Sequence, residues 1–394
     1  MGEVLPPFTR AEYLNRIAKT KARMEKAGIE VLMVTSPANM FYLTGYDGCS
    51  FYTHQMAILA LEAEEPIWAG RGLDLTSARL TAFMAHENIR GYEDDFVGAV
   101  TRHPMQFMAE LLREKGWDAL SVGVEMDNYY FTARCWEVLQ RELPDATFRD
   151  GDLLVNKVRL VKSEAELALM REAGEIGTRT AQAAIEGIAV GARESVPVSR
   201  LYATQIAGTD AFGGDYSCKP PVFCAGPRVE AVHLTWQDRV FAEGDLTWFE
   251  TCGARHHYHA PVSRTVYLGK PAQALIDRAK ALVEALEAAL AAAKPGNTCT
   301  DIAIAWHKVA SAAGLEKNMR IGYPVGIGFA PTWGELSCGL HREDETELQP
   351  GMTFHAIPGI WEDTDTVVIS ESFEITETGA RRLTDLPLEL VVKN

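Results

Sequence analysis

Apolar residues recur at helical spacing near the start of the chain and predict a first helix. Thr9 followed by Glu12 forms a capping box, a pattern that begins many helices. The amphipathic stretch continues through about Lys26, and Gly28 predicts its end.

Apolar runs alternate with mixed stretches along the following hundred residues. Residues 31–37, VLMVTSP, predict a buried strand, and residues 41–48, FYLTGYDG, predict a strand followed by a turn. A hairpin, a helix and a further strand are predicted for 55–70, 73–86 and 121–127. Strands and helices that alternate over short connections predict an α/β domain with a mostly parallel or mixed sheet.

A domain boundary is predicted near residue 155, so that residues 1–155 form one domain and 156–394 a second. The second domain begins with a strand-like stretch. A second capping box, Ser163 with Glu166, then begins a long helix.

Helices and strand pairs alternate in the second domain. Two long helices are predicted for 274–293 and 301–314, and each ends near a glycine. Strand pairs are predicted from the apolar stretches at 245–253, 257–269, 352–361 and 367–379. Helices packed on an antiparallel sheet give an α+β domain.

Composition supports a soluble chain with two domains. The 394 residues are 47% hydrophobic and 23% charged, which is typical of globular proteins. The net charge of −16 disfavours a nucleic acid or an anionic membrane as partner. Seven cysteines without a CxxC pair are expected to be reduced thiols, and no apolar run reaches membrane-spanning length. A cytoplasmic location is expected.

The stretch FETCGARHHYHAPVSRTVYLG, 249–269, is the first candidate for chemistry. On an extended strand His257 and His259 would share one face, with His256 on the other. A His-x-His pair can bind zinc with a third ligand, but it also occurs in ordinary hairpins. Glu250 lies inside an apolar strand, where a carboxylate needs a partner or a function.

Five stretches of the second domain resemble the creatinase/aminopeptidase family, whose fold is called pita-bread. In chain order they are VRLVKSEAELALMREA, FCAGPRVEAVHLTWQDRVFAEGD, the histidine-rich hairpin, GYPVGIGFAPTWGE and LQPGMTFHAIPGIW. The first 155 residues resemble the non-catalytic domain of prolidases and creatinases. The resemblance implies an α/β N-terminal domain and an α+β pita-bread C-terminal domain.

Metal-dependent members of this family hold two divalent ions with two aspartates, a histidine and two glutamates. In this chain the corresponding positions hold Glu250, Pro261, Tyr323, Ile357, and either Ser370 or Glu371. Most of these side chains cannot bridge two cations. We therefore expect no metal and no cofactor, as in creatinase. Creatinase carries a glutamate where this chain has Ser263, so a creatinase activity is not expected.

Further stretches, among them GYDGCSFYTHQM, HLTW, PTWGE and GMTFHAIPGIW, resemble the ectoine hydrolases of the same superfamily. Ectoine is a cyclic amidine with a carboxylate, and its hydrolysis gives an N-acetyl-2,4-diaminobutyrate. The resemblance implies Glu250 as nucleophile or base, with His233 and Glu371 as further catalytic residues. The substrate-binding residues it implies are Tyr52, His54, Arg71, His257, His259, Tyr323, Trp333 and Glu335.

The resemblance also implies a homodimer in which the N-terminal domain of one subunit covers the pocket of the other. A deacetylase that acts on the product is an expected pathway partner.

Several alternatives remain open. The stretches PTWGELSCGLHRED and WEDTDTVVISESF depart from the ectoine hydrolase pattern, so hydroxyectoine or another cyclic amidine or guanidine is an alternative substrate. An Xaa-Pro metallopeptidase would need bound manganese, cobalt or zinc, and a non-catalytic relative would bind without turnover. His233 and Trp333 are alternatively core residues, and Tyr323 alternatively fills the space of a lost metal ligand.

Overall fold

The computed structural model describes residues 7–361 and 365–394 of the chain. Residues 362–364 lie outside the described residues, and they are part of the stretch WEDTDTVVISESF that departs from the ectoine hydrolase pattern. The chain divides into two compact units, Met1–Arg159 and Leu160–Asn394. Among the described residues, no helix is both long and apolar enough to cross a membrane.

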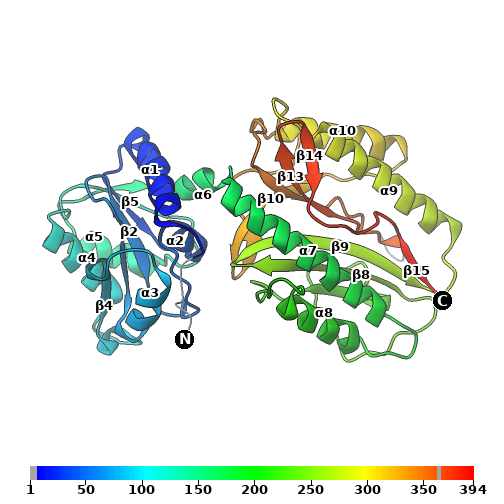
Figure 1. The fold of residues 1–394 in the computed structure, drawn as a ribbon, viewed down its shortest axis with the longest axis horizontal. Helices are drawn as coiled ribbons and strands as arrows, with labels where there is room; N and C mark the ends of the chain where they lie inside the picture. Colours follow the sequence, from blue (N-terminus) through cyan, green and yellow to red (C-terminus); the bar gives the residue numbers. More distant parts are fainter. Residues whose placement is uncertain (1–6, 362–364) are drawn as a thin grey trace. The chain divides into compact units, whose positions relative to one another are not determined.

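The first unit is built on a mixed six-stranded sheet with the strand order β4-β3-β2-β1-β5-β6 (Figure 1). β1 pairs antiparallel with β2 and parallel with β5, which confirms the predicted α/β class. Its helices and strands are α1 Arg10–Ala27, β1 Val31–Val34, α2 Pro37–Thr44, β2 Met56–Ala60, β3 Ile67–Arg71, α3 Leu75–Thr81, β4 Ile89–Tyr92, α4 Pro104–Lys115, β5 Ser121–Val124, α5 Ala133–Glu142, β6 Thr147–Asp150 and α6 Leu154–Arg159.

Helix α1 begins and ends as predicted. The Thr9 side chain accepts a hydrogen bond from the Glu12 backbone N–H, and Gly28 ends the helix in the left-handed conformation, with φ 65°. The strand predicted at 41–48 is wrong, because Phe41–Thr44 belong to α2. Ser36 caps that helix and Pro37 occupies its first turn, a combination that starts a helix.

The strand-like stretch after residue 155 is also a helix, α6. Its buried side chains Leu154, Val155 and Val158 are spaced by one and three residues, which places them on one helical face. The capping box of Ser163 and Glu166 is present in the structure and begins α7.

The second unit is built on a nine-stranded sheet with the main order β14-β13-β12-β10-β9-β8-β7, which confirms the predicted α+β class. β11 adds to β10, and β15 adds to β9. Its elements are α7 Glu164–Gly187, α8 Ser195–Ala207, β7 Val222–Ala225, β8 Leu246–Arg255, β9 Tyr258–Leu268, α9 Gln273–Ala292, α10 Cys299–Ala312, β10 Gly322–Phe329, β11 Thr332–Gly334, β12 Thr353–Ala356, β13 Glu371–Thr376, β14 Gly379–Arg382 and β15 Val391–Lys393.

The predicted hairpin is formed by β8 and β9, which pair antiparallel from Leu246 opposite Tyr267 to Arg255 opposite Tyr258. His256 and His257 form the two-residue turn, with φ values of 45° and 62°. The expectation that His257 and His259 share a strand face is therefore wrong. Positive φ at both central residues is the geometry of the tight turns that suit the twist of a hairpin.

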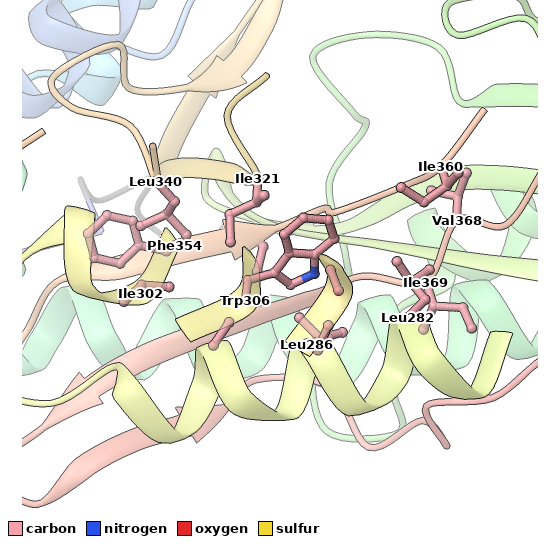
Figure 2. Close-up of a cluster of buried hydrophobic side chains, with 14 of the residues drawn as sticks. Leu282, Leu286, Ile302, Trp306, Ile321, Leu340, Phe354, Ile360, Val368 and Ile369 are labelled. Carbon is pink, nitrogen blue, oxygen red and sulfur yellow. The ribbon is translucent and has the colours of Figure 1, made fainter. Parts of the chain in front are cut away.

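Strand β8 separates two apolar cores, because successive side chains point to opposite faces of the sheet. Trp248 packs with residues of α9 and α10, whereas Phe249 packs with residues of α7 and α8. Figure 2 shows the α9/α10 core, in which Trp306 lies among aliphatic side chains such as Leu286. Glu250 follows Trp248 at a spacing of two and so faces the α9/α10 side of the sheet.

Candidate active site

A cavity of about 400 Å³ opens in the second unit, next to β8, β10 and β11. Four of the predicted site residues line it, namely His233, Glu250, Tyr323 and Trp333. The volume lies in the range of small-molecule sites. The structure thus brings together residues that are up to 100 positions apart in the chain.

Glu250 is the residue on which the polar contacts of the cavity converge. Its side chain is 7% exposed, and its Oε2 atom lies 2.9 Å from the Lys219 ammonium. The Tyr323 hydroxyl donates a hydrogen bond to its other oxygen, Oε1, at 3.3 Å. A carboxylate buried in an apolar strand is costly without such partners. Both oxygens are therefore held in place at the cavity wall.

Behind Glu250 a chain of hydrogen bonds extends into the protein. The Trp333 indole N–H donates to the Tyr323 oxygen at 3.0 Å, and Nδ1 of His355 lies 3.2 Å from the same oxygen. His355 Nε2 lies 2.7 Å from the Ser370 hydroxyl. Because Tyr323 donates its proton to Glu250, we assign the His355 proton to Nδ1 and let Nε2 accept from Ser370. The network fixes the Tyr323 hydroxyl toward Glu250.

Burial shapes the protonation of this network. Burial raises the pKa of Tyr323 well above its ordinary value, and the negative charge of Glu250 acts in the same direction. Burial lowers the pKa of His355 to about 4, although Glu250 opposes the shift. At neutral pH Tyr323 is therefore a phenol and His355 a neutral imidazole.

His233 lies on the cavity wall and is exposed to solvent, which sets it apart from a core histidine. Three cations line the same cavity: Lys219, Lys317 and Arg320. Lys317 is buried and donates to the Gly359 carbonyl at 3.0 Å. A single carboxylate, Glu250, faces them among the described lining residues.

Glu371 is placed outside this group of lining residues. It is fully buried, and its Oε2 atom accepts a hydrogen bond from Arg382 at 2.8 Å. The Thr384 hydroxyl donates to its other oxygen at 2.7 Å. Burial raises the pKa of Glu371. The sequence left Ser370 and Glu371 as alternatives for the last metal-ligand position. The neighbouring Ser370 contacts His355 of the network behind Glu250, so Ser370 is the residue on the cavity side.

His257 and His259 also lie outside the lining residues. The His257 ring stacks on Phe329 with centroids 4.2 Å apart. His259 is fully buried; its Nε2 atom accepts from the Cys218 N–H at 3.1 Å, and Nδ1 lies 2.6 Å from the His257 carbonyl oxygen. Both ring nitrogens of His259 are thus engaged: Nε2 holds the segment that contains Cys218 to the hairpin, and Nδ1 contacts the hairpin turn at His257.

Glu335, one of the substrate-binding residues that the resemblance implies, is not among the residues that line the cavity. Its carboxylate lies 2.6 Å from the ammonium of Lys162, and both side chains are 1% exposed. This buried ion pair connects the residues before α7 to the segment after β11. The observed contact of Glu335 is therefore a structural one, with Lys162.

Tyr52, His54 and Arg71 belong to the first unit. The Nε and Nη2 atoms of Arg71 donate to the two carboxylate oxygens of Asp94, and its Nη1 atom donates to the Tyr52 hydroxyl oxygen at 3.2 Å. The Tyr52 side chain is otherwise exposed. The His54 ring lies close to Cys135. Their predicted contact with substrate remains a prediction.

The residues of the cavity do not fit the pair of divalent ions that the creatinase/aminopeptidase resemblance implies. Such a pair needs several bridging oxygens. Here Ile357 contributes an apolar wall, and the ammonium of Lys219 stands against Glu250 where a cation would bind. Among the described residues, two groups of side chains are close enough together to bind a metal ion, and neither includes a residue that lines this cavity. They are His54 with His103 and Cys135, and Cys299 with Cys338 and Asp344.

Four polar residues described at the site were not predicted from the sequence, namely Lys219, Lys317, Arg320 and His355. Lys219 lies in the irregular segment before β7, where no periodic pattern marks it. His355 lies in the strand predicted within 352–361, directly opposite Tyr323 of β10. Its position in the alternation of that strand was the signal that could have identified it.

Comparison with known proteins places these observations in a family. The sequence pattern of metallopeptidase family M24 matches residues 168–377, and the creatinase/prolidase N-terminal domain matches residues 16–161. An ectoine hydrolase from Halomonas elongata is 44% identical over the full length of both chains. An uncharacterized hydrolase/peptidase from Sinorhizobium fredii is 43% identical, covering 98% of this chain and 99% of its own.

Solved structures share the fold. The dipeptidase PepE from Mycobacterium ulcerans superposes with a TM-score of 0.80 at 23% identity, covering 98% of this chain and 99% of its own. The architecture described above is therefore that of the dipeptidases and prolidases.

Proposed function

The chain belongs to metallopeptidase family M24 and has a creatinase/prolidase N-terminal domain, and on this basis we propose that it opens the ring of ectoine by a hydrolysis that needs no metal ion. The 44% identity to an ectoine hydrolase along the whole chain makes it a hydrolase that acts on a carbon–nitrogen bond other than a peptide bond. The exact substrate, the absence of a metal and the role of each residue are the proposed parts.

The observation that carries the proposal is the single carboxylate of Glu250 in a cavity with aromatic walls. An amidinium is planar and cationic, so it pairs with a carboxylate and stacks on aromatic rings. Trp333 and Tyr323 provide such rings beside Glu250. A site with one carboxylate and three cations among its described lining residues suits a small zwitterion better than two divalent ions.

The proposed reaction adds water across the amidine. Glu250 either attacks C2 of the ring itself, which forms a covalent Glu250–C2 bond that water later cleaves to restore the carboxylate, or removes a proton from the water that attacks. The bond from C2 to one ring nitrogen then breaks, and that nitrogen leaves as an amine after it takes up a proton. C2 keeps its methyl group and its second nitrogen and becomes the acetyl carbonyl of the product. His233, exposed on the cavity wall, is the proposed proton carrier.

Glu371 and Glu335 are proposed to hold the fold around the site, in view of their partners Arg382 and Lys162. The homodimer, the contribution of the first unit to the pocket, the link to a deacetylase and the cytoplasmic location stay predictions.

Replacement of Glu250 by Gln tests the role of the carboxylate. Gln keeps the shape and removes the charge, so we expect the rate of ectoine hydrolysis to fall by about a thousandfold or more. The rate is followed by proton NMR of the acetyl product. Glu287→Gln on the exposed side of α9 is the matched control and should keep the full rate. A folded Glu250→Gln enzyme with nearly full activity would remove Glu250 from the mechanism.

A further inference from the structure

Lys219 lies in contact with the proposed catalytic carboxylate, although no sequence pattern singles it out. It belongs to the segment before β7, and its side chain is 24% exposed at the cavity wall. Its ammonium is 2.9 Å from Glu250 Oε2 and 4.0 Å from the centre of the Trp333 ring. The side chain is thus held by a carboxylate and by the face of an aromatic ring.

The other two cations of the cavity are placed differently. Lys317 is directed to the Gly359 carbonyl and lies 4.6 Å from the Trp361 ring. The guanidinium of the exposed Arg320 lies over the Tyr323 ring, 5.0 Å from its centre. Of the three lining cations, Lys219 is the one that contacts Glu250.

An ammonium has three N–H donors, and Glu250 needs one of them. The four-carbon stem of lysine also lets the ammonium shift by a small distance without displacing the backbone. A second anion that enters the partly exposed cavity beside Glu250 can therefore share this ammonium.

The chemistry of a carboxylated cyclic amidine places such an anion there. In ectoine the carboxylate is carried by C4, and C4 is separated from the reacting carbon C2 by one ring nitrogen. When Glu250 faces C2, the substrate carboxylate lies a few bonds away on the same ring edge, within reach of a cation that touches Glu250.

We propose that Lys219 binds the carboxylate of the substrate while Glu250 meets its amidinium, so that this ion pair recognises both charges of the zwitterion. The inference rests on the proposed function. It makes Lys219 the specificity-determining residue. Arg71, which the resemblance implies as a substrate-binding residue, contacts Asp94. The preferred substrates are cyclic amidines with a carboxylate next to the amidine nitrogen.

The test compares ectoine with 2-methyl-1,4,5,6-tetrahydropyrimidine, which has the same amidine ring and no carboxylate. The kcat/KM of each compound is measured by proton NMR for the wild-type protein and for Lys219→Met, Lys219→Arg and Arg320→Met. A charge-assisted hydrogen bond corresponds to a preference of about 10- to 100-fold for ectoine in the wild type. Lys219→Met should lose most of that preference, whereas Lys219→Arg and Arg320→Met should keep it.

The outcomes separate the inference from the proposed function. A wild-type protein that hydrolyses neither compound contradicts the proposed function itself. If the wild type prefers ectoine and Lys219→Met slows both compounds equally, Lys219 only orients Glu250 and the inference is wrong. A loss of preference in Arg320→Met, with Lys219→Met unchanged, also overturns it. Should Lys219→Met fail to fold, Lys219→Gln gives the same neutralisation with a polar end.

Discussion

At the scale of single residues, the properties of the site follow from the enclosure of one carboxylate. Glu250 is buried between buried neighbours of β8, so the stability of its charge depends on the few groups that touch it. Lys219 compensates the charge, and Tyr323 supplies a hydrogen bond. Each contact is specific enough to be removed by one substitution.

Tyr323→Phe removes the hydroxyl that connects Glu250 to the network behind it. The variant loses the hydrogen bond to Glu250 and leaves the buried Trp333 N–H without its acceptor. We expect the free energy of unfolding to fall by about 1–3 kcal/mol, the cost of an unsatisfied buried donor. The rate of hydrolysis should fall by about tenfold, because one hydrogen bond to the reacting carboxylate is lost.

Urea unfolding and NMR kinetics measure the two effects. Tyr267→Phe removes the same oxygen from a half-buried tyrosine on β9 and serves as the control. Equal behaviour of the two variants would show that the network does not support Glu250.

The sequence and the resemblance identified Glu250 and Tyr323 separately, but they predicted neither Lys219 nor the contacts that join these residues. A charged residue inside the apolar run LTWFETC predicts that some partner exists. The partner Lys219 is 31 positions away and Tyr323 is 73 positions away, so only the folded chain brings them together. For the same reason, Ser370 could be distinguished from Glu371 only by the contact with His355.

At the scale of elements, the position of β8 depends on its close contact with α7. Gly253 of β8 and Gly177 of α7 face each other where the helix crosses the strand. A Cβ atom on Gly253 would lie 1.9 Å from the Ala173 carbonyl oxygen and 2.3 Å from the Gly177 nitrogen. Both are backbone atoms, which cannot move aside without shifting the helix.

Gly253→Ala should therefore separate α7 from β8. We expect a loss of about 3 kcal/mol or more in the free energy of unfolding, or failure to accumulate as folded protein. Gly213→Ala, a site with open space around the added atom, should change the same quantity by less than about 0.5 kcal/mol. Urea unfolding of both variants measures the difference, and comparable stability would contradict the close packing.

Local sequence signals identified most elements, and the errors have a physical cause. Helices with side-chain caps, such as α1 at Thr9 and α7 at Ser163, were predicted at their observed starts. α2 and α6 have eight and six residues, too few for helical spacing to stand out from a short apolar run. The turn at His256 and His257 lacks the usual glycine or asparagine, so it was interpreted as strand.

At the scale of the whole molecule, buried neutral histidines couple stability to pH. Burial lowers the pKa of His259 to about 3, and its Nε2 atom accepts a hydrogen bond that a proton would break. In the unfolded chain the same ring takes up a proton near pH 6.5. The unfolded state therefore binds more protons between pH 6.5 and about 3, so the stability falls as the pH falls through this window.

A comparison of pH 7.5 with pH 5.5 isolates this effect. The wild type should lose about 1.4 kcal/mol more unfolding free energy between these pH values than His259→Asn, because one proton is taken up on unfolding. The exposed His86→Asn should lose as much as the wild type. Urea unfolding at both pH values gives the three differences. An identical loss in wild type and His259→Asn would contradict a neutral buried His259.

The most direct test of the whole account is the hydrolysis of ectoine after exhaustive treatment of the protein with EDTA. Proton NMR follows the appearance of N-acetyl-2,4-diaminobutyrate before and after treatment. Because the described lining of the cavity offers a single carboxylate, Glu250, with the Lys219 ammonium 2.9 Å from it, we predict an undiminished rate. A rate that disappears with EDTA and returns with a divalent cation would contradict the metal-free site, and no turnover under either condition would rule out ectoine as the substrate.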